Sequence, residues 1–216
     1  MIKTENISAS YGEISVLKEI SLNIKKGEFV SIIGDSGAGK TTLLQILGTL
    51  ENPKSGKIWI NNTDITKLTD KELSMFRNKN IGFVFQFHNL LSEFTALENV
   101  CLPAFINRES RKKVKERALK LLSLLNIEHR KEHKPNELSG GELQRVAIAR
   151  SLINNPKIIL ADEPSGNLDS KNAEDLHQLL LQLNKEFNQT IVVVTHNNSL
   201  AEITNRKLEI QDGMIT

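Results

Sequence analysis

The sequence has little cysteine, no long apolar run and no marked excess of charge. Its single cysteine, Cys101, excludes an internal disulfide and an all-cysteine metal site. The 28 basic and 26 acidic residues leave a formal net charge of +2, so composition gives no support for nucleic acid as a partner. No run approaches the roughly 18 apolar residues of a membrane span, and the N-terminal residues lack the apolar stretch of a signal peptide. We therefore expect a soluble protein of the reducing cytoplasm.

The sequence does contain enough apolar residues for a folded core. Hydrophobic residues make up 39% and charged residues 25% of the 216 positions, a composition typical of globular proteins and not of disordered chains. No internal repeat, low-complexity segment or linker divides the chain. The length fits one large domain or two small ones.

The two ends of the chain carry strand patterns. Residues 1–30 alternate polar and apolar side chains between turn signals, which predicts short antiparallel strands. Residues 29–33 have the pattern of a buried strand, and the apolar residues of 43–50 follow with helical spacing. Other predicted elements are strands at 57–65, 157–161 and 190–195 and a helix over 173–187.

The segment from about Phe87 to Asn155 is predicted to be mostly helical. Capping-box signatures at Thr69-x-x-Glu72 and Thr95-x-x-Glu98 mark two helix starts, and the apolar residues of 114–125 form a helical stripe. Strand–helix–strand units on both sides of this segment predict an α/β fold with a parallel sheet and a helical subdomain.

A glycine-rich loop follows the strand at 29–33. It matches the pattern G-x-x-x-x-G-K-[ST], in which backbone N–H groups cradle phosphate oxygens and the next helix adds the positive end of its dipole. Lys40 is expected to reach the β- and γ-phosphates, and the Thr41 hydroxyl is expected to ligate Mg²⁺. A plain glycine-rich turn is the alternative, and the flanking strand and helix weigh against it. The predicted nucleotide-binding residues are Gly34, Asp35, Ser36, Gly37, Ala38, Gly39, Lys40, Thr41 and Thr42.

Two carboxylates end the apolar run at 158–161. Asp162 stands at the predicted strand tip, where it can hold Mg²⁺, and Glu163 follows it, where it can orient or deprotonate a water. A solvated turn before Pro164 is the alternative reading of these acids. The phosphate loop favours the functional reading, because a magnesium nucleotide needs an acidic partner.

Two polar residues follow other predicted strands. His196 comes directly after 190–195, where a neutral imidazole can hydrogen-bond a γ-phosphate. Ligands bind at the carboxyl ends of parallel strands, which favours this role over a structural one. Gln86 ends the run 81–85, and its amide can contact Mg²⁺ or water.

The motif Leu138-Ser139-Gly140-Gly141-Glu142 opens a helix pattern before the acidic strand. Together with the phosphate loop, it makes the chain resemble the nucleotide-binding subunits of ABC transporters over essentially its whole length. The resemblance implies a P-loop NTPase, RecA-like core with a short antiparallel β subdomain and a helical subdomain, all in one ATP-binding domain. Residues 1–86 and 156–216 would form the core with the β subdomain, and about 87–155 the helical subdomain.

The resemblance also implies roles for single residues. Tyr11 is placed like the aromatic residue that stacks on adenine, Gln86 matches the Q-loop, Asp169 the D-loop and His196 the switch histidine. ATP and Mg²⁺ are the implied cofactors. The implied catalytic residues are Lys40, Gln86, Glu163 and His196, and the implied metal ligands are Thr41, Gln86 and Asp162.

Two family subunits pack head to tail, so the resemblance implies an ATP-dependent homodimer. Ser139 and Gly141 of one copy would then meet the γ-phosphate held by Lys40 of the partner subunit, and Gly140 and Glu142 belong to the same nucleotide-binding signature. The sequence departs from the common family pattern twice, with Glu142 where many members have Gln and with Asn197 where Asp is common.

A narrower resemblance is carried by residues 83–100, 136–142 and 163–169. These segments look like the ATPase subunit of lipoprotein-releasing complexes, the LolD type. That family implies two separate integral-membrane permease subunits, lipoprotein cargo handled indirectly, and a peripheral location on the cytoplasmic face of the bacterial inner membrane. ATPases of macrolide exporters and of a cell-division signalling complex remain alternatives.

Functions of other classes fit less well. A DNA-repair ATPase would carry a long coiled-coil insertion, and a ribosome-associated one would carry a second cassette. A nucleotide-binding scaffold without turnover needs neither Glu163 nor His196.

Overall fold

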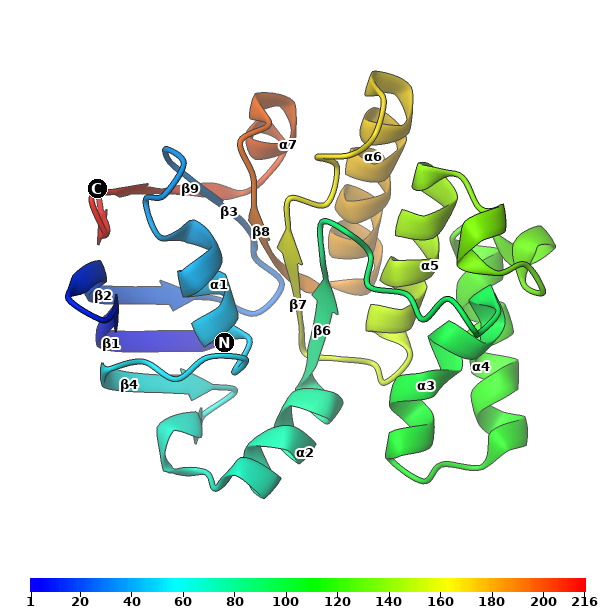
Figure 1. The fold of residues 1–216 in the computed structure, drawn as a ribbon, viewed down its shortest axis with the longest axis horizontal. Coiled ribbons are helices and arrows are strands. Elements are labelled where there is room, and N and C mark those ends of the chain that lie inside the picture. The colour runs from blue at the N-terminus through cyan, green and yellow to red at the C-terminus, as the bar shows by residue number, and fades with distance from the viewer.

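The computed structural model describes residues 1–216 as two sheets flanked by helices (Figure 1). The helices are α1 (Lys40–Leu47), α2 (Asp70–Asn80), α3 (Ala96–Ile106), α4 (Arg111–Leu124), α5 (Gly140–Leu152), α6 (Ser170–Phe187) and α7 (Asn198–Glu202). The strands are β1 (Ile2–Tyr11), β2 (Ile14–Ile24), β3 (Phe29–Ile33), β4 (Ser55–Ile60), β5 (Thr63–Asp64), β6 (Ile81–Val84), β7 (Ile158–Asp162), β8 (Thr190–Val194), β9 (Arg206–Gln211) and β10 (Met214–Ile215). Short 3₁₀ turns lie at Ile65–Lys67, Glu128–Arg130 and Pro135–Glu137.

The first sheet is antiparallel, with the order β2-β1-β4-β5. The sequence predicts short strands here, but β1 and β2 have 10 and 11 residues. They pair from one end to the other, but the register shifts three times, and Asn6 and Glu19 take positive φ values at these irregularities. One face of this sheet covers α1.

The second sheet has the order β10-β9-β3-β8-β7-β6, and every pairing except that of β10 with β9 is parallel. Both of its faces are buried, which explains the continuous apolar runs of β3, β7 and β8. Phe29 and Ile159 pack on the face toward α3–α6, and Val30 and Leu160 pack on the face toward α1 and the first sheet. The predicted α/β fold with a parallel sheet is confirmed.

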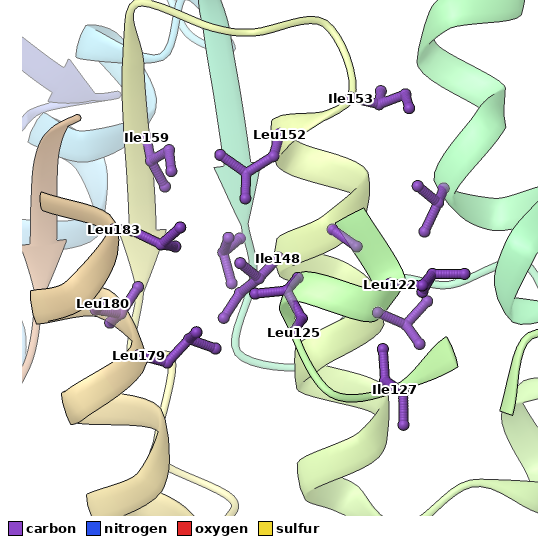
Figure 2. Close-up of a cluster of buried hydrophobic side chains, with 14 of the residues drawn as sticks. Leu122, Leu125, Ile127, Ile148, Leu152, Ile153, Ile159, Leu179, Leu180 and Leu183 are labelled. Atoms are coloured by element: carbon purple, nitrogen blue, oxygen red, sulfur yellow. The ribbon is translucent and has the colours of Figure 1, made fainter. Parts of the chain in front are cut away.

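The helical segment shares its core with the parallel sheet. Figure 2 shows Leu180 and Leu183 of α6 beside Ile159 of β7, with Ile148 and Leu152 of α5 next to them. All are buried, and each side chain of this size contributes about 1.5–3 kcal/mol. The same cluster extends into α3 and α4, so these helices are fixed to the sheet by continuous packing.

Helix ends follow local sequence signals. The predicted capping boxes at Thr69 and Thr95 are confirmed, because each hydroxyl accepts the backbone N–H three residues on and each glutamate closes the box. The predicted helix over 43–50 ends earlier, at Leu47, because Gly48 caps it; Leu50 lies outside and is 45% exposed. The sequence patterns did not reveal β9, β10 or α7. None of the helices combines the length and apolar character needed to cross a bilayer.

Candidate nucleotide-binding site

A pocket of about 430 Å³ opens at the carboxyl ends of β3 and β8, above the glycine-rich loop that leads into α1. This is the edge at which parallel α/β sheets bind ligands. The predicted residues that line it are Gly34, Ser36, Gly37, Gly39, Lys40, Thr41, Thr42, Gln86, Glu163 and His196. Val16 and Val194 also line it and escaped the sequence analysis, because apolar strand residues carry no chemical signal.

The loop is shaped by glycine where it touches β2. Gly39 has a φ of +102°, and a Cβ added there would lie 2.7 Å from Leu17 Cδ2 and 3.0 Å from the Val16 carbonyl oxygen. Only glycine fits both the backbone conformation and the space. The Lys40 ammonium donates to the carbonyl oxygens of Gly34 and Asp35 at 2.9 and 2.8 Å, which holds it across the mouth of the loop.

Thr41 and Asp162 face each other between α1 and the tip of β7. The Thr41 hydroxyl donates to Asp162 Oδ1 at 3.2 Å. Burial raises the pKa of Asp162, and the Glu163 carboxylate adds to the rise, while Thr41 and Lys40 oppose it. A cation beside these oxygens would offset both the burial and the repulsion.

Hard oxygen donors of this kind suit Mg²⁺. The structure brings no three His, Cys, Asp or Glu side chains together as a metal cluster. The Thr41 hydroxyl and the Asp162 carboxylate, which lie within hydrogen-bond distance of each other, are oxygen donors of the kind that suits Mg²⁺.

Glu163 and His196 are in direct contact. Strands β7 and β8 pair in register Asp162↔Val194, so the residues that follow them emerge side by side. Glu163 Oε1 lies 3.0 Å from the backbone nitrogen of His196, which donates to it, and 2.8 Å from His196 Nδ1. Glu163 has a positive φ of 44°, which turns the chain out of the sheet. Its side chain is only 14% exposed, whereas that of His196 is 72% exposed.

Gln86 lies where the sheet meets the helical segment. Its backbone carbonyl oxygen accepts a hydrogen bond from Asn167 Nδ2 at 3.0 Å, which joins Gln86 to the loop that leads from Glu163 to Asp169. Asp169 itself caps α6 through the backbone nitrogens of Lys171 and Asn172. It does not line the pocket.

Tyr11 is the last residue of β1, and it does not line the pocket. Its hydroxyl donates to Glu51 Oε2 at 2.7 Å, and this bond is the main reason that the pKa of Tyr11 is raised. The residue is 51% exposed, so ring surface remains open to a ligand.

The signature residues lie outside the pocket, at the start of α5. Ser139 is the N-cap, and Glu142 completes a capping box with it. Glu142 also accepts a hydrogen bond from Arg130 Nε at 2.9 Å, and the pKa of its carboxyl is lowered by these donors despite its partial burial. A Cβ on Gly140 would lie 3.4 Å from the Leu168 side chain, so the signature borders the loop before α6. Arg130 was not foreseen, because the ion pair joins residues of unrelated motifs.

Comparison with known proteins identifies the class. Residues 17–166 match the family described as ABC transporter. The dimeric structure of the bacterial ABC transporter cassette MJ0796 superposes with a TM-score of 0.92 at 48% identity, covering 100% of this chain and 96% of that one. The same cassette bound to ADP and Pi gives a TM-score of 0.91. The chain therefore belongs to the ABC transporter family, and the expected ABC ATPase architecture is confirmed.

Within that family, the chain is similar to the lipoprotein-releasing system ATP-binding proteins LolD. The protein of Bacteroides thetaiotaomicron is 60% identical over 215 residues, which cover 100% of this chain and 99% of that protein. The protein of Bdellovibrio bacteriovorus is 48% identical over 209 residues, which cover 97% and 95%. The narrower resemblance read from the sequence is confirmed by these relatives.

Proposed function

We propose that this chain hydrolyses ATP as the motor subunit of a membrane complex that releases lipoproteins from the bacterial inner membrane. The observation that carries the hydrolytic part is the convergence of the phosphate loop, Glu163 and His196 on one pocket. The lipoprotein part is supported by relatives that carry this name and are 54–60% identical over the whole chain.

Hydrolysis would use the groups that line the pocket. Glu163 would orient the attacking water and accept its proton, a role worth about 10²–10⁴ in rate. Lys40 would neutralise charge that develops on the transferred phosphoryl group. The exposed His196 imidazole has room to leave Glu163 and hydrogen-bond the γ-phosphate, which would free the carboxylate for the water.

Mg²⁺ would be held by Thr41, Asp162 and Gln86 together with phosphate oxygens. When bound, it neutralises phosphate charge and fixes the phosphate chain. The Thr41 hydroxyl would exchange its hydrogen bond to Asp162 for this role. At the other end of the nucleotide, Tyr11 would stack on adenine.

The complete site would form between two copies of the chain. The signature residues are absent from the lining of the pocket in their own chain, which favours a role in the pocket of a second copy. At the N-terminus of α5 they present backbone N–H groups and the positive dipole end, which suits a phosphate. The related MJ0796 cassette is dimeric. Head-to-tail packing would bring Ser139 and Gly141 to the ATP bound at Lys40 of the partner subunit.

Two separate integral-membrane permease subunits would be the other partners, on the cytoplasmic face of the inner membrane. A second pocket of about 430 Å³ lies between the sheet and the helical segment, and its lining includes Phe85, Asn89, Ile106 and Arg150. Ile106 is 73% exposed there. An apolar face of a partner helix would bury it. The lining does not include Leu91 or Phe94, which are also exposed.

The segment that follows Gln86 is tied to α5 and to α3 by side-chain hydrogen bonds. Arg150 of α5 donates to the carbonyl oxygens of His88 and Asn89. The buried Asn99 of α3 donates to the carbonyl oxygen of Leu91 and accepts from its backbone nitrogen at 2.8 Å. Movement of the segment after Gln86 would therefore reach the signature helix.

Native co-purification tests the proposal. A tagged chain expressed in its own host should retain two kinds of membrane protein subunit, and lipoproteins should be found with the complex by mass spectrometry. Recovery of an exporter or of a cell-division membrane protein without lipoproteins would refute lipoprotein release and leave only the ATPase reading.

A further inference from the structure

A buried histidine on α6 lies outside the candidate site and has no role in the proposed reaction. His177 is 2% exposed. Its Nε2 lies 3.1 Å from Ser165 Oγ, and its Nδ1 lies 3.5 Å from Ser199 Oγ. The Ser199 hydroxyl in turn donates to Asn197 Oδ1 at 2.7 Å. These four side chains form a continuous chain of hydrogen bonds.

The two ends of this series of hydrogen bonds lie in the two loops that carry Glu163 and His196. Ser165 follows Glu163 by two residues in the turn after β7, and it is buried. Asn197 follows His196 directly and caps α7. The imidazole of His177 therefore lies between the loop that carries the proposed base and the loop that carries the proposed γ-phosphate ligand.

With a neutral imidazole, one arrangement of protons satisfies all four groups. The single Ser199 hydroxyl proton goes to Asn197 Oδ1, so Ser199 must accept from His177. A neutral imidazole with its proton on Nδ1 makes this bond and leaves Nε2 to accept from the Ser165 hydroxyl. The bonds then run in one direction, from Ser165 through His177 and Ser199 to Asn197.

The surroundings favour the neutral imidazole that this arrangement needs. Burial lowers the pKa of His177, and the Glu174 carboxylate, 3.8 Å from Nδ1, opposes the shift. A protonated ring would have no acceptor for the Ser165 hydroxyl.

We propose that His177 is a positioning residue for ATP hydrolysis, which fixes the loop of Glu163 relative to the loop of His196 through Ser165 and Asn197. The inference rests on the proposed roles of Glu163 and His196. His177 itself touches neither substrate nor reacting atoms. Its effect follows from geometry, because a displacement of about 1 Å at a catalytic group can reduce a rate by about 10²-fold.

The test compares His177→Leu with a matched control on the same helix. Leucine keeps much of the volume and removes both hydrogen bonds, so kcat for ATP should fall about tenfold while KM stays within about twofold. Asn184 is also buried on α6, but its amide donates to Gly27 and Gln189 at the other end of the helix. Asn184→Leu should lower thermal stability and leave kcat unchanged.

Two further variants separate positioning from packing. In His177→Gln, the amide reaches the Ser165 hydroxyl in place of Nε2, so this variant should recover part of the lost kcat. If His177→Leu does not fold, Ser165→Ala removes one link with little change in packing and should lower kcat in the same way. Hydrogen exchange of the backbone amides in 163–168 and 196–200 should become faster in His177→Leu and in Ser165→Ala.

Wild-type kcat in folded His177→Leu, or an equal loss of kcat in Asn184→Leu, would overturn the positioning role. Glu163→Gln is measured alongside. If Glu163→Gln keeps wild-type turnover, the proposed function itself fails. If it is inactive while His177→Leu is unaffected, only the role of His177 is refuted.

Discussion

Replacing Gly39 by alanine tests the shape of the phosphate loop, and Gly37 provides the matched control. Both glycines have positive φ, +102° and +82°, so alanine is strained at either position. A Cβ at Gly37 meets nothing within 4 Å, whereas one at Gly39 lies 2.7 Å from Leu17 Cδ2 and 3.0 Å from the Val16 carbonyl oxygen. Leu17 is completely buried, so it has little room to yield. The pair of variants separates backbone strain from the clash.

The magnitudes follow from these two effects. The left-handed conformation costs an alanine about 1–2 kcal/mol, and overpacking against a buried side chain costs about 1–3 kcal/mol. Gly37→Ala should therefore lose about 1–2 kcal/mol of unfolding free energy and Gly39→Ala about 2–5 kcal/mol. Urea unfolding monitored by circular dichroism gives both values, and calorimetric titration with ATP should show the greater loss of affinity for Gly39→Ala.

Equal stability of the two variants would refute this reasoning. It would mean that β2 and the loop separate at little cost, so the close approach at Gly39 would not be what shapes the phosphate site.

Three further predictions address single steps of the proposed cycle. Glu163→Gln should bind ATP with near-normal affinity and lose about 10²–10⁴ in turnover, because shape is kept and the base is removed; a phosphate-release assay that finds normal turnover contradicts the role. Tyr11→Ala should weaken ATP binding by roughly 1 kcal/mol through loss of stacking, and Tyr11→Phe should not; if calorimetry finds both unchanged, the ring does not contact the base. Ile106→Asp should weaken retention of the membrane subunits in a pull-down, while Phe187→Asp, an exposed apolar residue at the far end of α6, should not; equal retention by both variants would place the docking surface elsewhere.

The sequence predicts most clearly those elements whose apolar residues form a run or follow a regular period. The strands β3, β7 and β8 are mainly apolar runs, and α6 buries Leu176, Leu180 and Leu183 on one face, interrupted by His177 and Asn184. Strand β9 was missed because Arg206–Gln211 has only Leu208 and Ile210 buried between charged and polar residues. Its pairing with β3 comes from tertiary packing, which local patterns do not record.

The sequence predicts which residues carry the chemistry of the site, but it does not predict which of them are in contact. The phosphate loop and the acidic end of β7 are local sequence motifs, so both can be recognised from the sequence alone. The contact between Glu163 and His196 depends on the adjacency of β7 and β8, which strand order decides. The hydrogen bond between Ser165 and His177 could not be predicted either, because a single histidine in a helix belongs to no sequence motif.

ATP-driven release of a lipoprotein from reconstituted vesicles tests the central claim most directly. The complex of this chain with its membrane subunits, placed in vesicles that contain a labelled lipoprotein, should transfer the label to the soluble fraction only when ATP and Mg²⁺ are added. Substitution of Glu163→Gln in the same complex should abolish release while ATP still binds. Release without nucleotide, undiminished release by Glu163→Gln, or no release by an ATP-hydrolysing complex would contradict the account.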